Sequence, residues 1–185
     1  MIKLVKTIGI ISATIPYLFI LTSIILSPWF SIYDNALSDL GNIAHNGYVA
    51  YIFNFGLMIA GLFTTSFAIL LSYVKRSWKF LIWTPLLLIT SVDLFLIGVF
   101  SEDWGVAHWI VSVIFFLMMI VTMFVYSYLS WPLGSPGIGA LTLIFGFVSV
   151  VVWFGRWPWQ GIAIQETTTV IMSSIWLMLV SIKNV

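Results

Sequence analysis

The sequence contains no cysteine. This absence excludes disulfide bonds, thiolate metal ligands, cysteine nucleophiles and palmitoylation. Charged residues are also scarce, at 7% of the chain with a formal net charge of +1, and the basic ones form no patch with interleaved aromatics, so we expect no nucleic-acid partner. Hydrophobic residues make up 62% of the chain and its mean hydropathy is +1.14, which leaves too few polar side chains to cover a water-soluble domain.

Long apolar stretches fill most of the chain, separated by charged residues, glycines and prolines. Most approach the roughly 20 residues that a helix needs to cross the hydrocarbon core of a bilayer. The first follows Lys3 and Lys6, as the core of a signal peptide would, but it is too long for one and more spans follow it. We predict an all-α polytopic membrane protein, a single domain over residues 1–185, whose six-transmembrane-helix bundle has spans at about 7–26, 48–74, 80–100, 106–131, 138–154 and 162–182.

The basic residues predict the orientation of this bundle, because Lys and Arg near span ends are retained in the cytoplasm. With six spans, one side carries Lys3, Lys6, Lys75, Arg76, Lys79 and Lys183, and the other carries only Arg156. We therefore expect both termini in the cytoplasm and a multi-pass protein of the plasma membrane, in contact with membrane lipids.

The acidic residues and both histidines lie on the predicted outer side or are buried closer to it: Asp34, Asp39, Asp93, Glu102, Asp103, Glu166, His45 and His108. Such a gathering indicates an outward-facing polar site between helices. A plainer interpretation is that lipid excludes charged groups, which then collect at the interfaces whatever the function. The sequence leaves both interpretations open.

Asp93 is the carboxylate placed deepest in a predicted span, eight residues before Ser101. That separation corresponds to about 12 Å along a helix. An intramembrane carboxylate is costly unless it is paired, protonated or in a wet cavity, so it is a functional candidate. Its structural alternative is a protonated side chain that is hydrogen-bonded to Asn54, Thr90 or a neighbouring hydroxyl.

Glu166 and Asp39 also have structural alternatives. Glu166 falls near the start of the last span, where the helix dipole favours an anion, and Arg156 is its expected partner. Asp39 lies in the long outer connection 27–47, which is a candidate cap over the bundle because long loops in compact folds often cover a site. Alternatively, Asp39 is only the N-cap residue, and Gly41 only a turn residue, of a short interfacial helix.

A metal site is a further hypothesis, because imidazoles and carboxylates together suit zinc or a similar ion: His45, His108, Asp39 and Glu102. The spacing does not enforce it, since the sequence has no H-E-x-x-H or His-x-x-x-His pattern. G-x-S-x-G and a phosphate-binding glycine loop are absent too, so we expect no cofactor-binding site of those kinds. Whether a metal ion is bound stays open.

Several segments together resemble the domain-of-unknown-function family 998 of prokaryotic and archaeal membrane proteins. In chain order they are Ser38-Asp39-Leu40-Gly41, Phe53-Asn54-Phe55-Gly56-Leu57 with Gly61, and Gly98-Val99-Phe100-Ser101-Glu102 followed by His108. The chain departs from the family at Thr167, where an arginine usually follows the glutamate, and at Ser101, which is often proline. The resemblance implies a six-span bundle with no established activity, and it singles out Ser38, Asp39, Asn54, Glu102, His108 and Glu166.

These patterns support three hypotheses about function. The first is a site that binds or processes a lipid or small amphiphile, with Asp39, Glu102, His108 and Glu166 as candidate catalytic residues. The second is a non-enzymatic accessory subunit, packed against partner membrane subunits or further copies of itself. The third is a proton-coupled or ion-coupled transporter that uses Asp93 and Glu166. The sequence does not say whether the protein is an enzyme, and it names no substrate.

Overall fold

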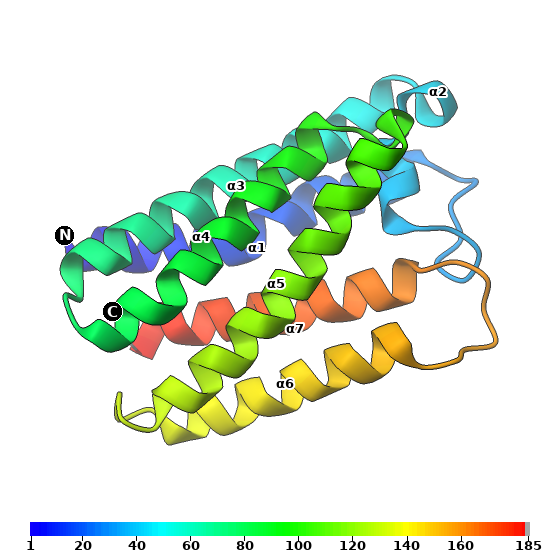
Figure 1. Cartoon of the computed structure of the whole chain (residues 1–185). Helices are drawn as coiled ribbons and strands as arrows, with labels where there is room; N and C mark the ends of the chain where they lie inside the picture. Colours follow the sequence, from blue (N-terminus) through cyan, green and yellow to red (C-terminus); the bar gives the residue numbers. More distant parts are fainter. Residues whose placement is uncertain (184–185) are drawn as a thin grey trace.

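The computed structural model describes residues 1–183, and the regular elements of this part of the chain are all helices (Figure 1). Six are long, namely α1 (Ile2–Leu26), α3 (Tyr48–Val74), α4 (Trp78–Val99), α5 (Val106–Ser130), α6 (Pro136–Phe154) and α7 (Ala163–Lys183). Three are short, namely η1 (Leu37–Gly41), α2 (Ile43–Asn46) and η2 (Glu102–Trp104). All six long helices have the length and apolar composition to cross a membrane, which confirms the predicted count of six.

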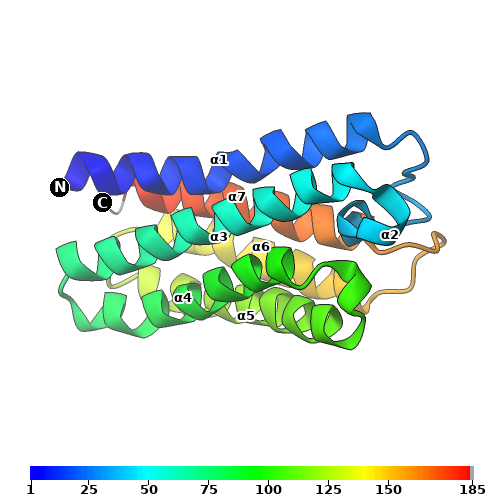
Figure 2. The same cartoon turned by 90° about the horizontal axis from the view of Figure 1, so that it is seen from above.

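The long helices form a ring in chain order. Each packs against the next, and α7 returns to pack against α1, which closes the ring. Because the helices run alternately up and down, both termini lie at the same end of the bundle (Figures 1 and 2). A ring of six helices surrounds a central space. The side chains that point into this space determine whether it is filled.

Four helix starts differ from the sequence prediction: α4 begins at Trp78 instead of Phe80, α7 at Ala163 instead of Ile162, and α1 and α6 differ as follows. Helix α1 begins at Ile2 instead of Thr7, because Lys3 and Lys6 continue the helix instead of preceding it. The Lys6 Nζ donates a 3.0 Å hydrogen bond to the Ile182 carbonyl in the last turn of α7, where such carbonyls have no partner within their own helix. Helix α6 begins at Pro136 instead of Ile138, since proline suits the first turn of a helix.

Helices α3 and α4 approach closely through small and hydroxyl side chains. A Cβ atom on Gly61 would lie 2.6 Å from the backbone nitrogen of Phe95, so only glycine fits this contact. Across the same interface, Thr65 and Ser91 share a 2.8 Å hydrogen bond between their hydroxyls. Small residues and interhelical hydrogen bonds are the usual means of helix association in lipid. The face of α3 that carries Gly61 and Thr65 therefore packs against α4.

The two ends of the bundle carry opposite charges. The termini and the α3–α4 and α5–α6 turns form the basic end, which holds Lys3, Lys6, Lys75, Arg76, Lys79 and Lys183. Residues 27–47, 100–105 and 155–162 form the acidic end, with Asp34, Asp39, Glu102 and Asp103 in these connections and Glu166 in the adjoining turn of α7. The candidate site lies at the acidic end.

Candidate functional site

Residues 27–47 fold over the acidic end of the bundle, where η1 packs against α3 and α7. Leu37 and Leu40 are buried and anchor η1. The Asp39 Oδ2 accepts hydrogen bonds of 3.0 Å from both the Ala36 backbone N–H and the Asn35 side-chain amide. Asp39 is therefore the third residue of η1 and accepts from the N–H of the N-cap residue Ala36, instead of being an N-cap residue itself as predicted.

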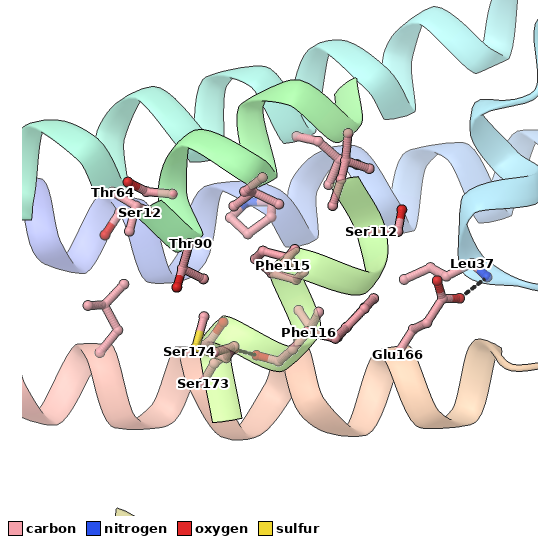
Figure 3. A pocket seen from close by; sticks show the side chains of 18 of the residues that line it. Ser12, Leu37, Thr64, Thr90, Ser112, Phe115, Phe116, Glu166, Ser173 and Ser174 are labelled. Atoms are coloured by element: carbon pink, nitrogen blue, oxygen red, sulfur yellow. Dashed lines mark hydrogen bonds between the residues drawn. The ribbon is translucent and has the colours of Figure 1, made fainter. Parts of the chain in front are cut away.

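Glu166 joins the last helix to this segment. It lies in the first turn of α7 with only 6% of its surface exposed. Its Oε2 accepts a 2.5 Å hydrogen bond from the Leu37 backbone N–H, which Figure 3 draws, and the carboxyl group also accepts from the Ser38 backbone. The predicted partner, Arg156, is exposed, and no ion pair joins the two within residues 1–183. Backbone N–H groups hold this carboxyl group in place of a cation.

Glu102 extends the site from the neighbouring connection. Its side chain, in η2, hydrogen-bonds to the side chains of Asp39 and Asn42. The pKa of Glu102 is raised to about 7, first by burial and then by the hydrogen bond to Asp39 and the negative charges of Asp39 and Asp103. Glu102 is therefore close to half protonated near neutral pH, and its proton can lie in the hydrogen bond to Asp39.

Asp103 has a structural role next to the site. Its two oxygens accept hydrogen bonds of 2.6 and 2.9 Å from the backbone N–H groups of Ile43 and Ala44 at the start of α2, and the Ser101 hydroxyl lies 3.2 Å away. Partial burial raises the pKa of Asp103, but these hydrogen bonds outweigh that effect and leave it lowered. Asp103 therefore stays ionised and ties η2 to α2.

His108 lies in the first turn of α5, buried below η2. Its Nδ1 lies 2.7 Å from the Phe100 carbonyl, and because a carbonyl only accepts, Nδ1 carries the proton. In the neutral imidazole, Nε2 is then the acceptor, and the Ser112 hydroxyl lies 3.3 Å from it. This pair of contacts fixes the orientation of the ring.

A pocket of about 590 Å³ opens beside these groups on the flank of the bundle, and we call it the lateral pocket. At the acidic end its lining is polar: Ser38, Glu102, His108, Ser112 and Glu166. The apolar residues Trp109, Trp153, Phe154 and Ile162 also line the pocket near this end, and further along α5 its lining is apolar: Val113, Phe116, Leu117 and Ile120. Ile120 follows His108 by twelve residues, so the pocket runs about 18 Å along α5.

A second cavity, of about 80 Å³, lies between the helices, and we call it the interior cavity. Figure 3 shows it between Glu166 at one end and the hydroxyls of Ser12 and Thr64 at the other. Four residues line both cavities: Ser38, Ser112, Phe116 and Glu166. The lateral pocket and the interior cavity therefore adjoin at Glu166.

The structure brings Ser38, Asp39, Glu102, His108 and Glu166 to the acidic end, where the three carboxyl groups influence one another's charge. Among residues 1–183, no three His, Asp or Glu side chains form a group that could hold a metal ion. The metal hypothesis therefore gains no support from the geometry of these side chains.

Other predicted residues lie apart from this site. His45 is exposed, and its ring packs on Trp29 with 4.2 Å between ring centroids. The Asn54 side-chain amide donates a 2.9 Å hydrogen bond to the Gly41 carbonyl, so it holds the end of η1 against α3. Arg156 is exposed in the connection between α6 and α7.

Asp93 does not make a hydrogen bond to Asn54 or Thr90, the two partners that its structural alternative named. The Thr90 hydroxyl donates to the Leu86 carbonyl instead, at 2.9 Å. Asp93 is 8% exposed, and its Oδ2 is buried without a hydrogen-bond partner. It lines neither the lateral pocket nor the interior cavity.

Sequence reasoning missed Asn35 and Asn42, whose amides bind Asp39 and Glu102. The sequence could have indicated these two asparagines, since both lie within four residues of Asp39 in the same connection. It also missed Phe116 and Trp153, whose rings pack together at 4.6 Å between centroids in the wall of the lateral pocket. No sequence pattern distinguishes Phe116 and Trp153, because the spans contain many other aromatic residues.

The ring of six apolar helices defines an all-helical, multi-pass membrane protein. The chain belongs to the family described as "Protein of unknown function (DUF998)", whose model matches residues 10–183. No curated protein and no solved structure matches it.

Proposed function

We propose that this protein binds an amphiphile with a positively charged head group, taken from the membrane leaflet at the acidic end. One observation carries the proposal: the lateral pocket has carboxyl groups at its acidic end and an apolar lining toward the middle of the bundle. An amphiphile has the same two parts in the same order. Ligand pockets commonly combine such an apolar lining with a few convergent polar groups.

The charge of the site supports a cationic head group. Asp39, Glu102 and Glu166 act on one another electrostatically, and none of them has an ion-pair partner within the described residues. A partly buried ammonium group would compensate the negative charge of Asp39 and of ionised Glu102, whereas a phosphate or sulfate would add to it. Glu102, with its pKa of about 7, can release its proton when a cation binds.

The apolar half of the pocket supports a hydrocarbon tail. Leu117 and Phe154 line the pocket, yet 48% and 74% of their surfaces are exposed on the flank of the bundle. In a membrane that flank contacts lipid. An amphiphile can therefore enter sideways from the bilayer while its head group stays at the level of Glu102.

The distribution of charge supports an outward-facing site in the plasma membrane. The basic end carries Lys3, Lys6, Lys75, Arg76, Lys79 and Lys183, and basic residues near span ends are retained in the cytoplasm. The acidic end, with the lateral pocket, then faces the outside of the cell.

Equilibrium binding of octylamine and octyl sulfate to the protein in lipid nanodiscs tests the proposal. We expect octylamine to bind, octyl sulfate not to bind, and Glu102→Gln and Glu166→Gln each to weaken octylamine binding about tenfold, or 1.4 kcal/mol. Glutamine at position 166 keeps an oxygen for the Leu37 N–H, so the fold is preserved. Asp34→Asn is the matched control, since Asp34 is exposed at the same end.

Two results would contradict the proposal. One is equal binding of the ammonium and sulfate probes to the unaltered protein. The other is octylamine affinity that stays the same in both glutamine variants.

A further inference from the structure

Five of the hydroxyl groups that line the interior cavity are already satisfied. Each donates to a carbonyl three or four residues earlier in its own helix, at 2.8 to 2.9 Å: Ser12 to Gly9, Thr64 to Ala60, Thr90 to Leu86, Ser91 to Leu88 and Ser173 to Val170. Such back-bonding is a common way for Ser and Thr to be satisfied inside a helix. These hydroxyls therefore do not require water in the cavity.

Apart from Ser38, Ser112, Ser174 and Glu166, the rest of the interior lining is apolar. It includes Leu87, Ile97, Phe115, Met119, Trp176 and Leu177. A cavity whose polar groups are satisfied and whose walls are hydrocarbon stays dry and accepts apolar ligands. Its natural occupant is a hydrocarbon chain.

The shape of the interior cavity suits a chain that enters at Glu166. Along α7 its lining extends from Glu166 to Leu177, eleven residues that span about 16 Å. A volume of about 80 Å³ accommodates roughly five to eight groups of the size of water, a size close to that of a methylene group. A row of roughly five to eight methylene groups therefore fits along part of this length.

Phe116 separates the interior cavity from the lateral pocket. Its ring lines both, and it packs against Phe115 on the interior side and Trp153 on the lateral side. Ser38, Ser112 and Glu166 lie at the same junction. The interior cavity and the lateral pocket therefore meet at this polar junction, and the ring of Phe116 lies between them.

We propose that the ligand is a two-chain amphiphile, with one chain in the interior cavity and the other in the lateral pocket. This inference rests on the proposed function, which requires only a cationic head group and one apolar tail. It adds that the ligand has two chains and that the second chain lies in the interior cavity. The head group lies at the junction beside Glu166, and Phe116 lies between the two chains.

Tryptophan fluorescence tests where the chains lie, because Trp176 lines the interior cavity and Trp153 lines the lateral pocket. The probes are octylamine and dioctylamine with bromine on the chain ends, compared at equal mole fraction in nanodiscs. Bromine quenches nearby indoles. The quenching that is lost in Trp176→Phe measures the bromine in the interior cavity. The quenching that is lost in Trp153→Phe measures the bromine in the lateral pocket.

Phenylalanine is a conservative replacement at position 176, since the Trp176 indole N–H has no hydrogen-bond partner to lose. We expect dioctylamine to quench both tryptophans and octylamine to quench mainly Trp153. A filling variant, Ser173→Leu, should weaken dioctylamine binding about tenfold and leave octylamine binding unchanged. Thr168→Leu is the matched control, because Thr168 is on the same helix and lines neither cavity.

The outcomes separate this inference from the proposed function. If octylamine binds but neither probe quenches Trp176, the interior cavity holds no chain and the inference fails while the proposed function stands. If octylamine quenches Trp176 as fully as dioctylamine does, the ligand needs only one chain and the inference also fails. If neither probe binds the unaltered protein, the proposed function itself is wrong.

Discussion

The charge of Glu102 depends strongly on its surroundings, since this residue is half-buried next to Asp39. Its pKa of about 7 in the folded protein compares with an ordinary value of 4.5. A carboxyl group with a raised pKa stabilises the folded state when it is protonated. That contribution is fully present below about pH 4.5 and is lost as the pH rises through 7.

We therefore expect the unaltered protein to be less stable at about pH 8 than at about pH 5, by an amount on the order of 1 kcal/mol, because Glu102 is only partly shielded from solvent. Thermal unfolding in detergent at both pH values measures the difference. Glu102→Gln should reduce it, since glutamine has no proton to lose. A pH dependence that is the same in this variant would show that other groups cause it.

The sequence predicted which residues collect at the acidic end but not what holds them. Glu166 was expected to pair with Arg156, and it instead accepts the backbone N–H of Leu37, a residue 129 positions earlier. That contact exists only because α7 closes the ring against α1 and brings the start of the last helix under η1. Side-chain patterns carry no information about a free backbone N–H so far away.

At the scale of helices, most of the fold was predictable because lipid imposes a simple rule. A span needs a long apolar stretch, and the six stretches in the sequence became six helices. The helix ends were harder to predict, as α1 shows, since a lysine at an interface can continue a helix as readily as end it. The ring order of the helices was not predictable, because it depends on close contacts such as that of Gly61 with α4.

The contact between α3 and α4 leads to a prediction about Gly61→Ala. The added methyl group would lie within 2.6 to 2.8 Å of the Phe95 backbone, which cannot move aside as a flexible side chain would. We expect a loss of about 1–3 kcal/mol in stability. Thermal unfolding of the purified protein measures it.

Gly137→Ala is the matched control, since a Cβ atom there meets nothing within 4 Å. It lies in the first turn of α6, where alanine suits a helix better than glycine does. Equal unfolding temperatures for the two variants would argue against a close α3–α4 contact.

For the whole molecule, the separation of charge between the two ends determines which side of the membrane the pocket faces. The absence of native cysteine makes orientation directly measurable, because one introduced cysteine is the only thiol in the chain. Gln160→Cys places it at the acidic end and Ser77→Cys at the basic end, between Arg76 and Trp78. Neither substitution removes a basic residue, so the charge asymmetry that sets orientation is kept.

We expect a membrane-impermeant maleimide to label Gln160→Cys in intact cells and to label Ser77→Cys only after the cells are permeabilised. Labelling of the basic end in intact cells would reverse the orientation. The lateral pocket would then open toward the inner leaflet and its anionic lipids. An acidic site on that side would meet a different pool of amphiphiles, so this measurement determines which leaflet's lipids should be tested as ligands.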